Sequence, residues 1–370
     1  MIGKLRLAIL GAGHIAETMA TTVCHMETVE LYAVAAREES RARAFAEKYG
    51  AKGYYGSYEE MLRDDQVELV YIATPHSHHA AHAKLCIEHR RPVLCEKAFT
   101  TTAAEAAEVL QLAKERGVFL AEAMWVRYMP MSVMLREAID AGKIGTVTAL
   151  TANLGYSVLH KERLARPELG GGALLDLGVY TLNFATWLLG DEPERIETTV
   201  VPLEAQRDEE KSSAKECAKA EGKSGACGMA AQSNGGTCGE GTAEARRLKY
   251  GIDTVDKQEI VTLVYPGGVV ASLFNTMAAV TDRKGFVYGT EGHIEVENVN
   301  NYEEFRIYNN RYELVETVRR PEQITGYEYE VEACRRALEA GQLECEEMPH
   351  AHTLNILRIT DAIVEQWNAR

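Results

Sequence analysis

The spacing of apolar residues gives the first third of the chain an alternating texture. Short apolar runs, which predict strands, are separated by segments with the spacing of helices. The predicted strands are Leu5–Leu10, Glu30–Ala36, Val67–Ala73, Pro92–Lys97 and Val118–Ala121, with a short extended piece at Gly53–Tyr58. The predicted helices follow Gly13 and then cover Ser40–Tyr49, Tyr58–Arg63, His79–His89 and Thr101–Arg116. Such alternation predicts an N-terminal Rossmann-type, doubly wound parallel α/β sheet.

From Gly145 onward the pattern changes to strands that alternate between apolar and polar residues. These are Thr146–Tyr156, Arg195–Val201, Glu259–Tyr265, Gly268–Thr276, Gly285–Tyr288, His293–Glu297 and Phe305–Tyr308. Helices are expected at Met131–Ala141, Leu174–Leu189, Tyr327–Ala340 and His350–Asn368. Alternation of this kind predicts an open, mostly antiparallel sheet with helices on one face. We therefore expect two domains, residues 1–123 and 124–370.

Residues 205–249 differ from the rest of the chain. They are rich in Lys, Glu, Ala, Gly and Ser and have almost no large apolar side chains. Such a segment buries too little surface to order itself, so we predict a mobile excursion between two strands. It carries Cys217, Cys227 and Cys238, whose spacing matches no usual metal-ligand pattern.

Charge and composition narrow the class of protein. The chain has 370 residues and a formal net charge of −15, which argues against a nucleic-acid partner. The first strand begins at Leu5, and no apolar run approaches the roughly 20 residues of a membrane helix. The cysteines form no C-x-x-C pair. We therefore expect a cytoplasmic protein with reduced thiols and no membrane partner.

A glycine motif lies between the first strand and its helix. Residues 11–16 read Gly-Ala-Gly-His-Ile-Ala, a G-x-G-x-x-A turn. Gly11 permits the tight turn, and Gly13 lets a pyrophosphate approach the backbone. The helix N-terminus, which begins with His14 and Ile15, offers free N–H groups to phosphates. An ordinary βα turn is the alternative, but the following strand gives the βαβ spacing of a dinucleotide site.

The end of the second strand indicates which dinucleotide binds. NAD sites usually place an acid there, to hydrogen-bond the ribose 2′-hydroxyl. Here the residues are Arg37, Ser40 and Arg41, which suit a 2′-phosphate. We therefore favour NADP(H), with NAD(H) possible. The alternative is that both arginines are solvated charges beside Glu38 and Glu39.

Several polar residues follow the carboxyl ends of the other strands, where doubly wound sheets bind ligands. We assign Thr74, Pro75, His76, His79, Glu96 and Lys97 to the cofactor site. The histidines from His76 to His82 also suit a metal, since His78 and His82 are four residues apart, but their place after a strand favours cofactor contact and we predict no metal. Lys97 could bind a substrate hydroxyl, or be an ordinary exposed lysine.

A second group of residues suits a substrate pocket. Asp176 and Tyr180, four apart in the predicted helix after Gly170, share one face and could bind a diol and move a proton. Trp125 and Arg127 begin the second domain at the interdomain cleft, and Tyr156 ends its first strand. Taken alone, Asp176 and Tyr180 also fit a helix-start acid and a half-buried aromatic. Arg127 likewise fits interdomain packing.

Four segments together resemble the Gfo/Idh/MocA family of NAD(P)-dependent oxidoreductases. They are Ala33–Arg37, Val93–Lys97, Glu122–Pro130 and Gly170–Tyr180. The resemblance covers nearly the whole chain outside residues 205–249. It implies that Lys97 contacts the reacting oxygen and the nicotinamide ribose, and that Asp176 orients substrate. Tyr180 stands where many members have a catalytic histidine, and is implied to be the general acid/base, with a pKa lowered by Lys97.

The resemblance also implies an activity and an assembly. The expected reaction is hydride transfer between NADP(H) and a sugar, cyclic polyol or dihydrodiol, with Lys97 and Tyr180 handling the proton. The helix at 350–370 is expected to pack back on the N-terminal domain, and the open sheet to form a homodimer or higher oligomer. Ala98 departs from the family's E-K-P motif. A nucleotide-binding sensor without turnover is the alternative function.

Overall fold

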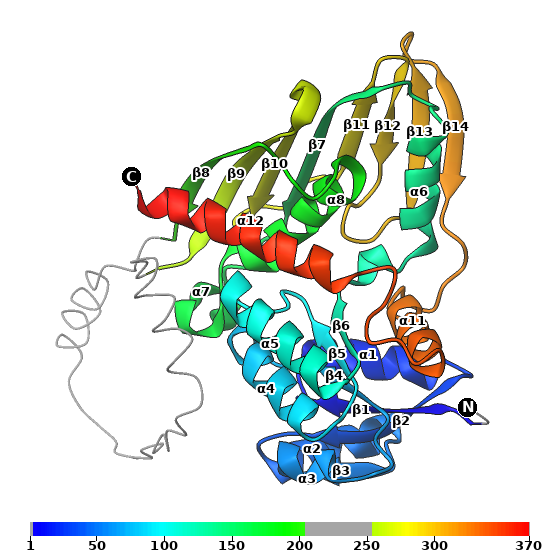
Figure 1. Ribbon diagram of the computed structural model, residues 1–370, viewed down its shortest axis with the longest axis vertical. Helices are drawn as coiled ribbons and strands as arrows, with labels where there is room; N and C mark the ends of the chain where they lie inside the picture. Colours follow the sequence, from blue (N-terminus) through cyan, green and yellow to red (C-terminus); the bar gives the residue numbers. More distant parts are fainter. Residues whose placement is uncertain (1–2, 204–253, 370) are drawn as a thin grey trace, which may run out of the picture.

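Two β-sheets organise the chain. The computed structural model describes residues 3–203 and 254–369, with the two sheets one above the other in Figure 1. The predicted excursion at 205–249 lies outside the described residues, as do Cys217, Cys227 and Cys238.

The N-terminal sheet has six parallel strands in the order β3-β2-β1-β4-β5-β6. The strands are β1 (Leu5–Leu10), β2 (Val29–Ala35), β3 (Gly53–Tyr55), β4 (Leu69–Ile72), β5 (Val93–Glu96) and β6 (Leu120–Ala123). The helices are α1 (His14–Cys24), α2 (Glu39–Tyr49), α3 (Tyr58–Leu62), α4 (His76–Glu88) and α5 (Ala103–Arg116). The predicted Rossmann-type doubly wound sheet is confirmed.

Two boundaries near the strand ends differ from the sequence prediction. Helix α4 begins at His76 rather than His79, because Pro75 at its N-cap fixes an extended backbone and the histidines continue directly into the helix. Strand β6 is shifted toward the C-terminus, since it pairs with β5 from Leu120 and not from Val118. This shift places Glu122 opposite Cys95 of β5, inside a strand whose residues are all buried.

The C-terminal sheet has eight strands in the order β14-β13-β12-β11-β7-β10-β9-β8. They are β7 (Val147–Gly155), β8 (Arg195–Pro202), β9 (Asp256–Val264), β10 (Val270–Thr276), β11 (Gly285–Gly289), β12 (Gly292–Val296), β13 (Glu304–Asn309) and β14 (Leu314–Arg319). Only β7 and β10 pair in parallel, so the predicted mostly antiparallel sheet is confirmed. The sequence missed β14, whose residues are all at least partly exposed and give no apolar alternation.

Helices cover one face of this sheet (Figure 1). They are α6 (Pro130–Asp140), α8 (Val179–Leu189) and α12 (His350–Asn368), with α11 (Glu328–Glu339) beside the Rossmann sheet. Helix α12 contacts both α5 and β8. Its Leu357 joins the core around β4 and β5, whereas Ile356 and Ile363 join the larger core. The Asp361 carboxylate accepts a hydrogen bond from the Ala103 N–H at 3.1 Å, at the start of α5.

The stretch Pro167–Leu189 corrects one expectation from the sequence. By length and composition it is apolar enough to cross a membrane, although no such run was expected. In the fold, 89% of its most apolar window is buried inside the protein. Its apolarity is therefore accounted for by its position between β7 and β10 of the larger sheet and α12, where both sides of α8 need apolar neighbours.

Candidate active site

The glycine turn forms an open cradle at the carboxyl end of β1. Gly11 has φ +105°, and a Cβ there would lie 3.0 Å from the Ala73 carbonyl oxygen. A Cβ on Gly13 would meet nothing nearer than 4.0 Å, so the space beside it is free. Gly13 is the N-cap of α1 and provides no side-chain cap, which leaves the first N–H groups of the helix available. His14, exposed, and Ile15, half-buried, form the first turn.

The end of β2 is cationic. Arg37 follows the strand, and Ser40 and Arg41 lie in the first turn of α2; all three are exposed. The Arg41 guanidinium donates a long hydrogen bond of 3.4 Å to the Ala12 carbonyl, which brings it to the glycine turn. Tyr58 and His78 lie close enough to Arg37 for its positive charge to act on the pKa of both side chains. Both neighbours were missed, because nothing in their local sequence connects them to β2.

His79 has a different place from the one predicted. It is fully buried, and its two ring nitrogens lie 2.8 Å from the carbonyl oxygens of Ala98 and Thr74. Burial lowers the pKa of His79 to about 4. The neutral ring has one N–H and donates to only one of these carbonyls. Because the ring is fully enclosed between the two loops, the assignment of His79 to direct cofactor contact is corrected. His79 lies between the loop after β5 and the loop after β4. The second loop includes Pro75, at the start of α4. The Thr74 hydroxyl is itself paired with His82 at 3.0 Å.

His76 binds the loop that leads to the turn carrying Asp176. Its Nδ1 donates to the Gly170 carbonyl at 2.9 Å, because a carbonyl can only accept. Burial, and then the charge of Lys97, lower the pKa of His76 to about 3, so the ring is neutral. A Cβ at Gly170, where φ is +70°, would lie 2.9 Å from the His76 Cβ. His76 therefore joins the Rossmann part to the segment that carries Asp176.

Lys97 and Asp176 form the centre of the site. The Lys97 ammonium donates to the Asp176 backbone carbonyl at 2.9 Å and to its Oδ1 at 3.3 Å. Arg163 binds the same carboxylate oxygen at 3.2 Å. Burial favours the neutral acid, but Lys97 and Arg163 outweigh it and hold the pKa of Asp176 below its usual value. Arg163 was missed because it lies in a short helix, α7 (Glu162–Ala165), without a recognisable motif.

A buried acid fixes the backbone around Asp176. Residues Leu174–Gly178 form one π-helical turn before α8. The Asp256 carboxylate accepts from the Leu174 N–H at 2.6 Å. Gly172, with φ +110°, is required here, since a Cβ would lie 2.2 Å from Asp256 Oδ1. The start of the helix is therefore set by β9 of the larger sheet.

Tyr180 completes the central group. Its hydroxyl accepts a hydrogen bond from Trp125 Nε1 at 3.0 Å, and the Lys97 ammonium lies 5.0 Å from its ring centroid. Trp125 in turn stacks on Tyr327 at 4.5 Å between ring centroids. Burial raises the pKa of Tyr180 well above its usual value. The expected lowering by Lys97 is therefore wrong: the ammonium faces the ring and not the hydroxyl, and desolvation prevails.

Glu96, beside Lys97, is held by the Rossmann core. Its carboxylate accepts from the Tyr71 hydroxyl and, at 3.2 Å, from the Lys97 N–H. Burial raises the pKa of Glu96 to about 7. The Lys97–Ala98 peptide bond is cis. These contacts place Glu96 beneath Lys97, as a support for the loop.

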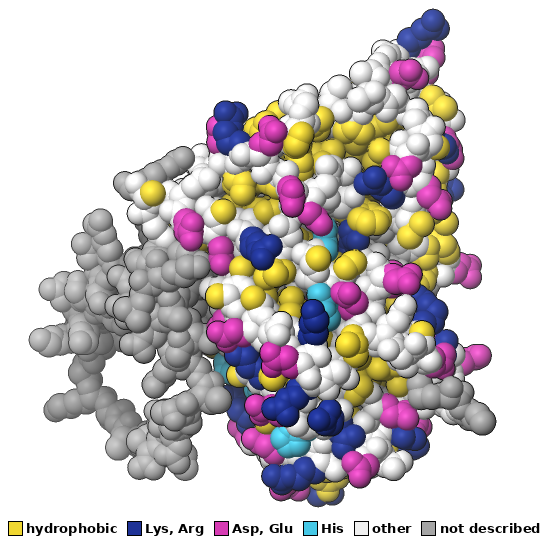
Figure 2. All heavy atoms as spheres, in the orientation of Figure 1, with side chains coloured by type: hydrophobic (Ala, Val, Ile, Leu, Met, Phe, Trp, Pro, Cys, Tyr) yellow, Lys and Arg dark blue, Asp and Glu magenta, His cyan; other side chains and the backbone are white. Residues whose placement is uncertain are grey.

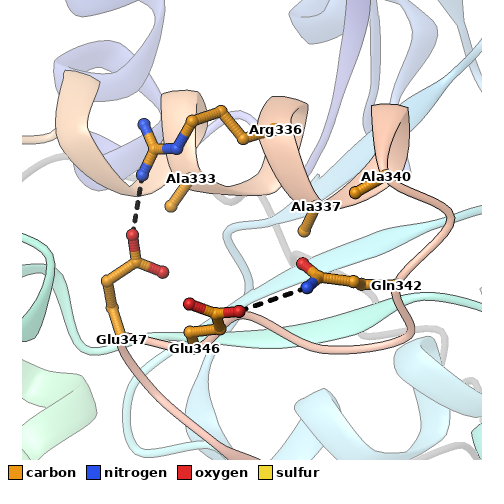
Figure 3. A pocket seen from close by; sticks show the side chains of 7 residues that line it. All are labelled: Ala333, Arg336, Ala337, Ala340, Gln342, Glu346 and Glu347. Atoms are coloured by element: carbon orange, nitrogen blue, oxygen red, sulfur yellow. Dashed lines mark hydrogen bonds and ion pairs between the residues drawn. The ribbon is translucent and has the colours of Figure 1, made fainter.

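Arg127 does not serve a substrate pocket. Its Nε and Nη2 donate to the Glu347 carbonyl at 3.2 and 2.8 Å, and its guanidinium lies 3.5 Å from the Trp187 ring centroid. The side chain is buried in these contacts, which all lie within residues 124–370, so the substrate role predicted for it is corrected to packing inside the C-terminal part. A pocket nearby, shown in Figure 3, lies between α11 and residues 342–347 and includes none of the Lys97 group.

Matches to family models agree with this architecture. Residues 5–124 match the Gfo/Idh/MocA oxidoreductase family with its NAD-binding Rossmann fold, and residues 133–295 match a Gfo/Idh/MocA C-terminal domain. A trans-1,2-dihydrobenzene-1,2-diol dehydrogenase from Danio rerio is 30% identical over 96% of this chain and 95% of its own length. The chain belongs to the Gfo/Idh/MocA family. The resemblance predicted from four segments is thereby confirmed.

Other relatives of this family member match over shorter spans. The Mus musculus trans-1,2-dihydrobenzene-1,2-diol dehydrogenase is 40% identical to this chain. The match covers 52% of this chain and 59% of the length of the mouse protein. A D-xylose 1-dehydrogenase (NADP(+)) from Hypocrea jecorina is 41% identical over 50% of this chain and 52% of its own. The fold matches that of an aldose-aldose oxidoreductase from Caulobacter crescentus, with a TM-score of 0.77 at 20% identity, covering 99% and 98% of the two chains.

The residues around the glycine turn fit an NAD(P) cofactor. Gly13 leaves open space, α1 has uncapped N–H groups, and Arg37 and Arg41 supply positive charge beside them. Gly11, Gly13, His14 and Ile15 would hold the pyrophosphate. Lys97, with Thr74 and Pro75, lies at the neighbouring strand ends, where the nicotinamide half of a dinucleotide is bound in such sheets.

Proposed function

We propose that this protein is an NADP(H)-dependent oxidoreductase that interconverts a hydroxyl and a carbonyl on a sugar, cyclic polyol or dihydrodiol. The observation that carries the proposal is the placement of the Lys97 ammonium between the Asp176 carboxylate and the Tyr180 ring. Relatives named for dihydrodiol and D-xylose oxidation support the substrate class. The nicotinamide, when bound, supplies the hydride chemistry.

Lys97 is the residue that binds and polarises the reacting oxygen. An ammonium has three donors, and two are engaged by Asp176. The third can donate to a substrate oxygen, and the two contacts with Asp176 orient the ammonium. Stabilising the negative charge that develops on that oxygen is the main electrostatic contribution available to this site.

Tyr180 exchanges the proton. Its raised pKa keeps the phenol protonated at neutral pH, so it is ready to donate to a carbonyl oxygen in the reductive direction. Trp125 donates to the phenol oxygen and leaves the O–H proton free for the substrate. In the oxidative direction the same oxygen would have to be a phenolate before it could accept the substrate proton, and burial opposes that form, so the site favours the reductive direction.

The preference for NADP(H) over NAD(H) rests on Arg37 and Arg41.

The decisive assay of the proposed function measures reduction of NADP⁺ and NAD⁺ with D-xylose, D-glucose and trans-1,2-dihydrobenzene-1,2-diol, using wild type and Lys97→Met. We expect turnover with NADP⁺ on at least one compound and its loss in Lys97→Met. Tight NADP⁺ binding without turnover on an extended sugar and diol panel would instead support a sensor.

A further inference from the structure

Residues that end or begin five strands of the larger sheet meet at one edge. Strands β7, β10 and β12 end there, and β9 and β11 begin there, as their pairings require. Asp256, at the start of β9, holds the turn that carries Asp176. Tyr156 follows β7, Asn300 follows β12, and Arg283 precedes β11. Through Asp256, this end of the sheet adjoins the turn that carries Asp176.

Tyr156 lies on the side of the sheet that faces the helices. In β7 the buried residues Ala152 and Leu154 alternate with partly exposed ones, and Tyr156 continues their parity. Tyr156 also lies near Tyr327, the ring that stacks on Trp125. Tyr156 is therefore close enough to influence Tyr327 electrostatically, and Tyr327 stacks on the indole that donates to Tyr180.

Arg283 is held against Tyr156 by an unusual backbone. Its φ of +59° lies in the left-handed region, which non-glycine residues rarely adopt. Asn153 Oδ1 accepts from the Arg283 N–H at 3.2 Å, and the Val299 N–H donates to the Arg283 carbonyl at 2.8 Å. Such a conformation persists only where the surroundings enforce it, and it often marks a functional position.

The guanidinium of Arg283 has donors to spare. Nη1 donates to the Tyr156 hydroxyl at 3.0 Å, and Asn300 Nδ2 donates to the same oxygen at 3.2 Å. The Arg283 Nε is shielded from solvent and has no hydrogen-bond partner. Within residues 3–203 and 254–369, Arg283 has no acidic partner. A buried guanidinium donor without an acceptor is costly, so a ligand oxygen is its natural complement.

Charge at the site is also out of balance. Lys97 and Arg163 share the carboxylate of Asp176, while burial shifts Glu96, beside Lys97, toward its neutral form. Arg283 has no acidic partner among the described residues. This excess is local, because the whole chain carries a formal charge of −15. A site with surplus cations favours a substrate that brings negative charge.

We propose that Arg283, positioned by Tyr156 and Asn300, binds an oxyanion at the end of the substrate remote from the reacting carbon. The substrate class is then a polyhydroxylated sugar that carries a carboxylate or a phosphate. Guanidinium pairs with either group through two parallel hydrogen bonds, which selects for it over a hydroxymethyl group. This inference rests on the proposed function, since it names the substrate of the same site.

Three sugars that differ only at carbon 6 test the proposal: D-glucose, D-glucuronate and D-glucose 6-phosphate. Wild type, Arg283→Met and the control Arg311→Met, which removes an exposed arginine from the β13–β14 turn, are compared in NADP⁺ reduction. We expect wild type to prefer one anionic sugar over D-glucose by about tenfold or more in kcat/KM. Arg283→Met should remove that preference by raising KM for the anionic sugar, whereas Arg311→Met should behave like wild type. Which anionic sugar is preferred distinguishes carboxylate from phosphate.

Equal effects of Arg283→Met on neutral and anionic sugars, or a wild-type preference for D-glucose, would overturn the proposal. If no sugar is turned over, the proposed function fails on this panel, and calorimetric binding of the same three sugars to the NADP⁺-loaded protein decides separately. Anion binding that weakens in Arg283→Met alone supports the assignment. Binding that is absent or unaffected by Arg283→Met refutes it.

Discussion

The Lys97 ammonium and the Asp176 carboxylate, 79 positions apart in the chain, lie 3.3 Å apart in the fold. Lys97 comes from the end of β5 in the Rossmann sheet, and Asp176 from the π-helical turn that leads into α8. Neither part of the fold contains both members of the pair. The pair exists only when the two sheets are assembled.

Asp176→Asn should uncouple this pair. The substitution keeps the shape but leaves Lys97 and Arg163 without a counter-charge, so Lys97 loses its orientation. We expect kcat to fall by about 100-fold or more, the usual range for a positioned acid–base partner. Steady-state NADP⁺ reduction checks this. Asp140→Asn, which alters an exposed pair with Arg136, is the matched control and should keep full activity.

Tyr180→Phe should separate proton transfer from folding. Losing the phenol is expected to lower kcat by about 100- to 10,000-fold. It also leaves Trp125 Nε1 without its buried acceptor, at about 1–3 kcal/mol in the free energy of unfolding. Kinetics and urea unfolding measure the two effects, with exposed Tyr312→Phe as control. Activity equal to wild type in Tyr180→Phe would remove it from the proton-transfer role.

Arg37→Asp should change the cofactor preference. An acid at the end of β2 repels a 2′-phosphate and can accept from a ribose 2′-hydroxyl. We expect the Kd for NADP⁺ to rise by about 100-fold, while the Kd for NAD⁺ changes little or falls. Fluorescence titration of both cofactors checks this. Arg43→Asp, which changes an exposed arginine of the neighbouring helix α2, should leave both affinities near wild type. A wild type that prefers NAD⁺ contradicts the assignment of Arg37.

Glu122 should make stability depend on pH. Burial raises its pKa to about 7 from the ordinary 4.5, so the folded protein holds a proton that the unfolded chain has lost between those values. Stability from this group is therefore present below pH 4.5 and is lost as pH rises through 7. Gln at this position cannot ionise. Relative to wild type, Glu122→Gln should gain up to about 3 kcal/mol between pH 5 and pH 8.

Chemical unfolding at pH 5, 6, 7 and 8 measures that difference. Glu115→Gln, at an exposed position on α5, should show a constant offset from wild type across the same range. A constant offset for Glu122→Gln as well would show that Glu122 titrates normally in the folded protein.

The larger sheet is expected to mediate self-association. Ile260 and Tyr288 project from the face opposite the buried residues of β9 and β11, and both are exposed. Figure 2 shows the other side of the sheet, which α8 and α12 cover, with hydrophobic side chains over its upper part and charged ones scattered over the Rossmann part. Ile260→Glu should halve the mass measured by light scattering, and Leu343→Glu, exposed outside the sheet, should not. An unchanged mass in Ile260→Glu would place the contact elsewhere.

Local sequence determined the Rossmann elements and the glycine turn. A parallel sheet buries both faces, so its strands appear in the sequence as continuous apolar runs. The positive φ of Gly11 favours glycine at this turn whatever the rest of the fold is. The family resemblance brought Lys97, Asp176 and Tyr180 together as candidates. Strand β14 escaped because an exposed edge strand has no apolar face to show.

Tertiary structure alone decided what these side chains do. The pKa of Tyr180 is raised because packing removes water from it, which no local pattern reports. Arg127 and His79 have side chains that often bind ligands. Here both lie against backbone carbonyl groups from other segments of the chain, which the local sequence does not reveal. Arg163 and Arg283 reach the site from segments without a motif. Periodicity predicts which residues are buried, whereas charge partners and hydration depend on contacts made only after the sheets assemble.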